Sequence, residues 1–170
     1  MKNLIKNKKN LAIELGSDLF KIVSSITPIV NVDLLIKNKY NQTLLTWRDD
    51  EFFGPGWHIP GGVIRYKELI SSRILKVAQN ELRVTKIKKQ SKLLALNEYL
   101  GVSRVRGHGI SLLYECMLYE LDAKKFKVYR DKEKKITIDK KGMWHNSSPI
   151  NLIEEQRCYR KFIDSYRYRI

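Results

Sequence analysis

The stretch that decides the fold begins Trp57-His58-Ile59-Pro60-Gly61-Gly62 and continues through the helix-like residues 69–82. Its opening residues close a loop, residues 49–62, that holds four of the nine glycines and two of the four prolines. Glycine frees the backbone and proline restricts it, so their concentration indicates an irregular loop of defined shape. Loops of this kind commonly carry binding and catalytic groups.

The helix after this loop contains one residue that its pattern does not explain. At 100° per residue, Ile70, Ile74 and Val77 lie on one apolar stripe, and Glu81 falls on the same stripe. A carboxylate on a buried face is costly unless it is paired or binds a cation. Two interpretations follow: Glu81 turns outward at the helix end to meet a lysine or arginine, or it faces inward and holds a cation.

Hydrophobic periodicity places further elements on both sides of this stretch. Strands around a central helix, with another helix at each end, predict an α/β or α+β domain. The domain is expected to occupy residues 1–170, with residues 1–13 as a basic N-terminal extension. Ser17 and Asp18 are alternative caps for the first helix. The predicted elements are a helix over 11–26, a hairpin of strands 30–36 and 44–47, a basic connector over 86–92, strands over 93–100 and 110–121, a charged loop or hairpin over 122–142, and a closing amphipathic helix over 150–168.

The chain is strongly basic, with 33 Lys and Arg against 18 Asp and Glu and a net charge of +15. Such an excess suggests a polyanionic partner, although a composition rich in Lys, Asn and Ile explains it equally well. The basic residues are scattered and accompany no nucleic-acid-binding motif. The apolar runs have the length of strands, which argues against a membrane span. The isolated Cys116 and Cys158 indicate a reducing, cytoplasmic compartment.

Residues 62–84 resemble the signature of the Nudix hydrolase superfamily. That signature is Gly, any five residues, Glu, any seven, then Arg-Glu-apolar-any-Glu-Glu-any-Gly-apolar. The resemblance implies an α/β/α sandwich around a mixed central β-sheet, with the signature forming a loop–helix–loop. The lead-in Trp57-His58-Ile59-Pro60-Gly61-Gly62 is also similar to that of the family. The matching positions are Gly62, Glu68, Lys76 in place of Arg, Ala78, Glu81 and Val84, whereas Val77, Asn80 and Arg83 depart from the signature.

The missing acidic residues make this signature resemble that of the GDP-mannose mannosyl hydrolase branch. The similarity extends over roughly residues 14–165. The segments with counterparts in that branch are residues 27–36 with Asp33, residues 44–48 ending in Arg48, His108 and Trp144.

The resemblance implies hydrolysis of a nucleotide-sugar by attack on the sugar carbon, with the nucleoside diphosphate as leaving group. One Mg²⁺ then suffices, because phosphate oxygens complete an octahedral shell that needs few protein ligands. The implied ligands are Glu81 and the backbone carbonyl of Gly61. Arg48 and Lys76 match cationic positions that face the diphosphate, and a solvated surface charge is the alternative for both.

Residues near the N-terminus of one subunit reach the partner's nucleotide in the same branch. The matching positions here are Glu14, Leu15 and Phe20, so the resemblance implies a homodimer. Phe20 is thereby a candidate for stacking on the base, although a Phe on an amphipathic helix also suits the core or a dimer contact.

The chain departs from the branch at the general base. Counting back from Trp144, a Gln ligand and a His base are expected at Ile138 and Asp139. Asp139 is therefore the candidate catalytic base, and an aspartate with an ordinary pKa of about 4 is a weak one. The other candidates are His58, His108 and His145.

The sequence thus predicts a Mg²⁺-dependent cytoplasmic Nudix hydrolase acting on a GDP-mannose-like nucleotide-sugar. A second departure, Val63 in place of an arginine, leaves the sugar and base open, since Arg65 reaches the same face only if this segment is extended. The alternative is a catalytically silent Nudix-fold protein that binds a nucleotide or nucleotide-sugar.

Overall fold

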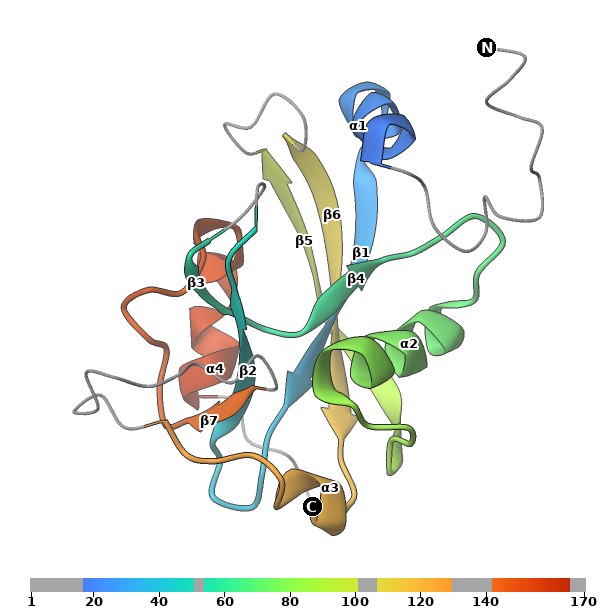
Figure 1. Ribbon diagram of the computed structural model, residues 1–170. Coiled ribbons are helices and arrows are strands. Elements are labelled where there is room, and N and C mark those ends of the chain that lie inside the picture. The colour runs from blue at the N-terminus through green and yellow to red at the C-terminus, as the bar shows by residue number, and fades with distance from the viewer. Residues whose placement is uncertain (1–16, 51–53, 101–106, 130–141, 166–170) are drawn as a thin grey trace.

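The computed structural model describes residues 17–50, 54–100, 107–129 and 142–165, which form two β-sheets and the helices around them (Figure 1). The predicted N-terminal extension, residues 1–13, lies outside the described residues. In chain order the elements are α1 (Ser17–Ile26), β1 (Ile29–Ile36), β2 (Thr43–Arg48), β3 (Gly56–His58), β4 (Gly61–Val63), α2 (Ile70–Leu82), β5 (Lys89–Leu100), β6 (His108–Met117), α3 (Glu120–Ala123), β7 (Met143–His145), the 3₁₀ helix η1 (Glu154–Tyr159) and α4 (Arg160–Ser165).

The larger sheet has four strands in the order β4-β1-β6-β5. β1 runs parallel to β6 and antiparallel to β4, and β5 runs antiparallel to β6, so the sheet is mixed. β1 lies inside this sheet because it is rich in Val, Ile and Leu, and its last five residues are all buried. Burial on both faces is typical of a strand that has a parallel neighbour.

The smaller sheet has three antiparallel strands in the order β3-β2-β7. The predicted hairpin of residues 30–36 and 44–47 is wrong. Both strands form, but in the described chain they meet at the bridge between Lys37 and Thr43 and then enter different sheets. A strand has two hydrogen-bonding edges, and those of β1 are taken by β4 and β6, while those of β2 are taken by β3 and β7.

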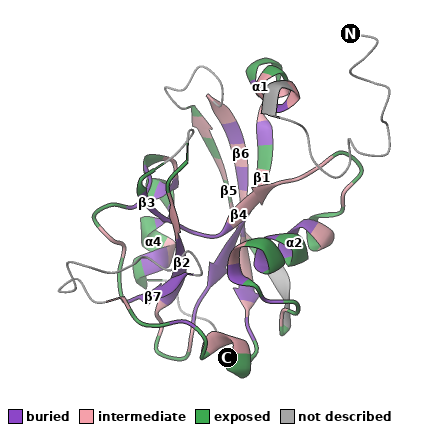
Figure 2. Cartoon of the chain, in the orientation of Figure 1, coloured by how far each residue is buried: buried purple, intermediate pink, exposed green. Residues whose placement is uncertain are grey.

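Two apolar clusters join the layers, and the most buried residues lie where the sheets and helices face each other (Figure 2). On one side of the larger sheet, α2 contributes Ile74 and Val77 to a cluster with Val32, Leu34 and Ile36 of β1. On the other side, Tyr159 of η1 and Ile163 of α4 join a cluster with Leu35 and residues of the smaller sheet. This arrangement confirms the predicted α/β/α sandwich with a mixed sheet and adds a second sheet.

Helix α2 confirms the helix predicted over residues 69–82, and the helix predicted over 11–26 is described from Ser17 onward. The closing helix expected over 150–168 is instead the 3₁₀ helix η1 followed by the short α4. Residues three apart eclipse each other in a 3₁₀ helix, and this geometry buries both Gln156 and Tyr159. In the described part of the chain, no helix has the length and apolar character needed to cross a membrane.

The later strands differ from the prediction at their ends. β5 begins at Lys89, so part of the expected basic connector joins the sheet, as lysines commonly do on an edge strand. β6 ends at Met117, because the ladder with β1 stops at the pair of Ile36 and Cys116. Residues 130–141 of the charged segment lie outside the described residues.

A buried lysine connects elements that are far apart in the sequence. The Nζ of Lys37 donates hydrogen bonds to the Thr43 hydroxyl (2.9 Å) and to the carbonyl of Ile163 (2.7 Å). Burial lowers the pKa of Lys37 to about 8. These contacts join the end of β1, the start of β2 and α4.

Candidate functional site

A cleft of about 670 Å³ is bordered by strands of both sheets, by α2 and by η1. Its lining includes residues of the glycine-rich loop, residues 49–62, and of helix α2. The polar residues that face it from different elements are Asp33 of β1, Thr46 and Arg48 of β2, His58 of β3, Gly61 of β4, Glu81 of α2 and Tyr159 of η1.

Glu81 faces inward at the C-terminal end of α2. Its carboxylate accepts hydrogen bonds from the Thr46 hydroxyl (3.1 Å) and from the Gly61 backbone N–H (3.3 Å). Burial raises the pKa of Glu81 to about 7, and the nearby negative charge of Asp33 adds to the increase. Glu81 therefore faces the cleft, and its predicted role as a ligand of a cation stays a prediction.

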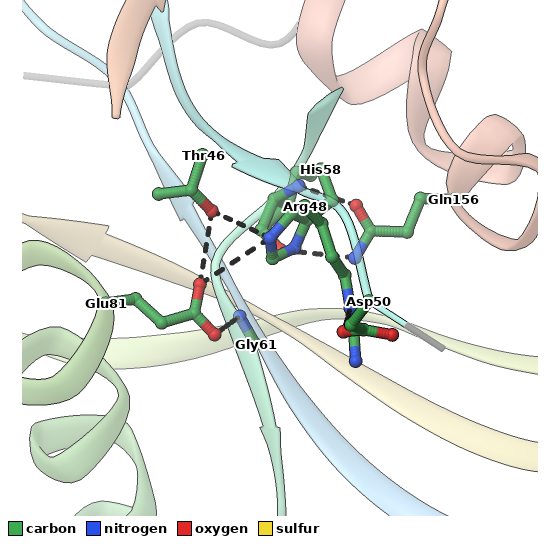
Figure 3. A network of polar contacts seen from close by, with 8 residues as sticks. Thr46, Arg48, Asp50, His58, Gly61, Glu81 and Gln156 are labelled. Carbon is green, nitrogen blue, oxygen red and sulfur yellow. Dashed lines mark hydrogen bonds and ion pairs between the residues drawn. The ribbon is translucent and has the colours of Figure 1, made fainter. Parts of the chain in front are cut away.

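His58 extends the polar network from Glu81 toward the C-terminal segment (Figure 3). Its Nε2 lies 2.9 Å from the Thr46 hydroxyl, and its Nδ1 lies 2.9 Å from the carbonyl of Ile59. The side chain of Gln156 binds both backbone groups of Ile59: it accepts a hydrogen bond from the Ile59 N–H and donates one to the Ile59 carbonyl. Both ring nitrogens of His58 are therefore engaged, and burial lowers the pKa of the ring to about 4.

The hydrogen positions in this network follow from counting donors. A carbonyl only accepts, so the proton of a neutral His58 ring resides on Nδ1, and Nε2 accepts from the Thr46 hydroxyl. The single hydroxyl hydrogen of Thr46 serves one acceptor at a time. When Glu81 is ionised, the Thr46 hydroxyl donates to it. When Glu81 is protonated, Glu81 can donate to Thr46, and the Thr46 hydrogen is then directed to His58.

Asp33 is a second buried carboxylate at the same cleft. It accepts hydrogen bonds from the Ser111 hydroxyl and from the Tyr159 hydroxyl, the latter at 2.9 Å. Burial raises the pKa of Asp33 to about 6. A Cβ atom on Gly61 would collide with its Oδ1, so the close approach of β4 to this carboxylate requires glycine at position 61.

Arginines supply the positive charge of the cleft. Arg48, predicted to bind substrate, lies in the lining, where its Nε is 2.5 Å from Asp50. Arg65, Arg73 and Arg83 also line the cleft. Arg83 caps α2 in the left-handed conformation (φ 57°), at the signature position where the family has glycine.

Comparison with known proteins agrees with this architecture. No family model matches the chain. A curated relative, the low-salt glycan biosynthesis protein Agl8 of Haloferax volcanii, is 28% identical over 105 residues, which cover 59% of this chain and 66% of the relative. The chain therefore matches slightly less than two thirds of the relative's length.

Solved structures give a more extensive match. A Nudix hydrolase from Nitrosomonas europaea superposes with a TM-score of 0.51 over 82% of each chain, at 11% identity. The chain has the Nudix fold. A MutT Nudix hydrolase from Burkholderia pseudomallei is 20% identical over 54% of this chain and 68% of its own, with a TM-score of 0.45.

The segment that resembles the Nudix signature, residues 62–84, contains an ion pair that holds its loop to its helix. Glu68, in the loop, accepts from Arg73 (2.5 Å to Nη2) and from Lys76 (2.8 Å). Within the loop itself, Glu68 accepts a hydrogen bond from the Arg65 N–H (3.0 Å). Lys76, the other cation predicted to bind substrate, is half exposed and is not among the residues lining the cleft, whereas Arg73 is.

Replacing Glu68 by Gln is expected to lower the free energy of unfolding by about 3 kcal/mol at pH 7. Burial alone would raise the pKa of Glu68, but hydrogen bonds from Lys76, the Arg65 N–H and Arg73 lower it from 4.5 to about 2. The contribution of a depressed carboxylate is complete above pH 4.5 and is lost as the pH falls through 2. Urea unfolding of both proteins at several pH values measures this difference.

The matched control is Lys76→Met, which removes the half-exposed partner of the same carboxylate. We expect it to cost about 1 kcal/mol or less, because exposed ion pairs contribute little. Two results would contradict a stabilising role of the ionised Glu68 carboxylate. One is an equal loss of unfolding free energy in the two variants, and the other is a loss in Glu68→Gln that does not become smaller below pH 4.5.

The other predicted site residues have different outcomes. Phe20 is 7% exposed, lies beneath the Arg65 guanidinium at 5.7 Å, and is not among the residues lining the cleft. Its predicted stacking on a base stays a prediction. Glu14, Leu15 and Asp139 lie outside the described residues.

The remaining histidines are held in different surroundings. His108 lies at the cleft but contacts Glu98 at 2.9 Å. His145 is buried beside the Trp57 ring, at 4.4 Å between ring centroids, and burial lowers its pKa to about 4. Four further residues of the cleft were not predicted from the sequence, because they come from three separate elements, β2, β6 and η1, and form no local motif: Thr46, Ser111, Gln156 and Tyr159.

Proposed function

We propose that the protein is a metal-dependent Nudix hydrolase that cleaves a nucleotide-sugar at the glycosyl carbon. Water attacks the anomeric carbon, the bond between that carbon and the phosphate oxygen breaks, and the nucleoside diphosphate leaves with the electron pair. The water proton passes to a base or to solvent. The observation that carries this proposal is one box carboxylate, Glu81, facing a cleft lined by arginines.

The donor set at this position suits a hard divalent cation such as Mg²⁺. Glu81 is hydrogen-bonded by the neutral Thr46 hydroxyl and Gly61 N–H, and a second carboxylate, Asp33, lines the same cleft. Two carboxylates close together favour a cation between or beside them. Glu81 and the Gly61 carbonyl would hold the ion, and phosphate oxygens and water would fill the other positions. When bound, the ion would stabilise the negative charge of the leaving diphosphate.

The residues of the chain then have distinct tasks. Arg48, Arg65 and Arg73 offer guanidinium groups to phosphate oxygens, for which their planar donors are suited. His58 orients Thr46, and through it Glu81, because both of its ring nitrogens are already engaged. Asp139 stays the candidate base proposed from the sequence.

The choice of a sugar-containing substrate has support from one relative. The protein of Haloferax volcanii that is 28% identical to this chain is named for low-salt glycan biosynthesis. Glycan assembly consumes activated sugars, and nucleotide-sugars are a common form of them. A homodimer and a cytoplasmic location are also proposed, on the resemblance given by the sequence.

The test is hydrolysis of GDP-, UDP-, CDP- and dTDP-sugars with Mg²⁺ in ¹⁸O-labelled water. We expect free sugar that carries the label and an unlabelled nucleoside diphosphate. Label in a phosphate, with release of a nucleoside monophosphate and a sugar phosphate, would show attack on phosphorus and reject the carbon-attack part. No turnover of any sugar nucleotide would reject the hydrolase.

A second candidate is a silent binder of nucleotides or nucleotide-sugars. Within the described ranges, no group of three or more His, Cys, Asp and Glu side chains is arranged to hold a metal ion. A site with so few ligands binds a metal mainly together with a phosphate ligand. Calorimetry separates the two candidates: tight binding of nucleotide-sugar with no turnover supports the silent binder.

A further inference from the structure

The larger sheet gives the cleft a polar floor. Asn31, Ser111 and Asn97 lie side by side on β1, β6 and β5, because the ladders pair Asn31 with Ser111 and Ser111 with Asn97. Asp33 and Tyr99 line the cleft in the neighbouring rows. We call these five residues the polar floor. Strand interiors normally present apolar side chains to a covered face, so a polar row at this depth requires an explanation.

The groups of the polar floor are only partly satisfied by each other. Ser111 donates to Asp33, and the Asn31 amide donates to the Tyr99 hydroxyl at 3.3 Å. The Asn97 amide nitrogen is buried, and among the described residues no partner of good hydrogen-bond geometry reaches it, although it faces the Tyr159 hydroxyl. A buried donor of this kind is costly unless something binds to it, and it lines the cleft.

The aromatic ring of Tyr99 adds an apolar surface to the polar floor. A Cβ on Gly109 would collide with the Tyr99 ring, so the ring lies directly across the backbone of β6. An aromatic face beside amide and carboxylate groups can take the apolar face of a pyranose ring while the polar groups take its hydroxyls. Glycine at position 109 is the condition for this placement.

Charge decides which part of a ligand suits this floor. A phosphate requires cations, but the polar floor contains neutral amides and hydroxyls together with the carboxylate of Asp33. The arginines Arg48 and Arg73 belong instead to other elements of the cleft, β2 and α2. Carboxylates and amides hydrogen-bond well to adjacent hydroxyls, because each hydroxyl both donates and accepts.

We propose that the polar floor is the subsite for the sugar of the nucleotide-sugar and recognises its hydroxyls through Asn97, Asn31 and Asp33. This inference rests on the proposed function. It places the sugar beside the reaction centre, because Asp33 contacts the Gly61 position and the Gly61 N–H contacts Glu81. The phosphates then lie toward the arginines, and the anomeric carbon lies between the two groups.

The experiment compares two ligands that differ only in the sugar. Calorimetry measures the dissociation constants of GDP-mannose and GDP, and of UDP-glucose and UDP, with Mg²⁺ under conditions of negligible turnover. Asn97→Ala is expected to weaken binding of the nucleotide-sugar by about 10-fold and to leave the affinity for the matching nucleoside diphosphate unchanged. Ser111→Ala, which removes one hydrogen-bond donor from Asp33, is expected to change the affinity for the nucleotide-sugar and to leave the affinity for the nucleoside diphosphate unchanged.

The control is Asn146→Ala, which removes an exposed amide that contacts Gln42 far from the cleft. Equal weakening of both ligands by Asn97→Ala would place the base or ribose on the floor and overturn the inference, as would no change for either ligand. Thermal unfolding shows whether Asn97→Ala is folded, and Ser111→Ala provides the comparison if it is not.

Failure of the proposed function is a separate result. If the wild type binds the nucleotide-sugars without hydrolysing them, the proposed hydrolase activity is rejected. A loss of affinity in Asn97→Ala for the nucleotide-sugar alone would still support the polar floor as the sugar subsite. If the wild type binds neither member of any pair, both the proposed function and the sugar subsite are rejected.

Discussion

Replacing Glu81 by Gln is expected to lower Mg²⁺-dependent turnover by about 10³-fold. A metal ion contributes several kcal/mol of charge stabilisation to the transition state, and each 1.36 kcal/mol is about one factor of ten. Glutamine has nearly the same shape as glutamate and keeps the contacts to Thr46 and Gly61, but it is a weak ligand for Mg²⁺. The measurement is kcat at saturating Mg²⁺ and substrate.

Stability separates loss of the metal site from loss of the fold. Because burial raises the pKa of Glu81 to about 7, its ionised form is less stable in the folded chain than in the unfolded chain. The neutral variant is therefore expected to keep or raise the Tm at pH 8 without metal, and to lose any Tm increase that Mg²⁺ and a nucleoside diphosphate give the wild type. Glu120→Gln, at an exposed ion pair on α3, is the control. A lower Tm without metal, or unchanged kcat, would contradict the assignment.

Replacing Gly61 by Ala is expected to have the second largest effect. The added methyl group would occupy the position of the Asp33 carboxylate and press β4 away from β1. Overpacking of this kind costs about 1–3 kcal/mol of stability, and displacement of a catalytic group by 1 Å costs about 10²-fold in rate. Urea unfolding and kcat on the same nucleotide-sugar measure the two effects.

Gly62→Ala is the matched variant on the next residue. Its added Cβ would meet a methyl group of Val77 at 2.9 Å, which is a smaller overlap than the one that a Cβ on Gly61 would have with the Asp33 carboxylate. We expect a smaller loss of stability and of kcat than for Gly61→Ala. The reverse order, or a Gly61→Ala enzyme with wild-type kcat, would show that Asp33 and Gly61 do not shape the reaction centre.

The sequence predicts the part of the fold that depends on local pattern. The periodicity of residues 69–82 locates α2 almost to the residue, because one apolar stripe against a sheet defines a helix. The pairing of β1 with β6 and of β2 with β7 depends on which edges meet in space. The sequence predicted that β1 and β2 pair as a hairpin because they follow each other in the chain, but in the structure they belong to different sheets.

The same distinction holds for the candidate site. Glu81 and Gly61 are predictable because the Nudix signature is contiguous, and Arg48 follows from its place at the end of a strand. Asp33 was noted only as a matching residue, and nothing local links it to Tyr159. Lys76 was expected at the substrate by its place in the signature, yet the structure pairs it with Glu68.

The last described segment has a consequence for the order in which the protein folds during synthesis. Tyr159 reaches back 126 residues to Asp33, and the carbonyl of Ile163 reaches back 126 residues to Lys37. Contacts so distant in sequence form late, because the chain between them must be ordered first. A nascent chain that has released both sheets from the ribosome still lacks the contact of Tyr159 with Asp33 and the contact of Ile163 with Lys37. Completion of the fold and completion of the cleft are thus a single event.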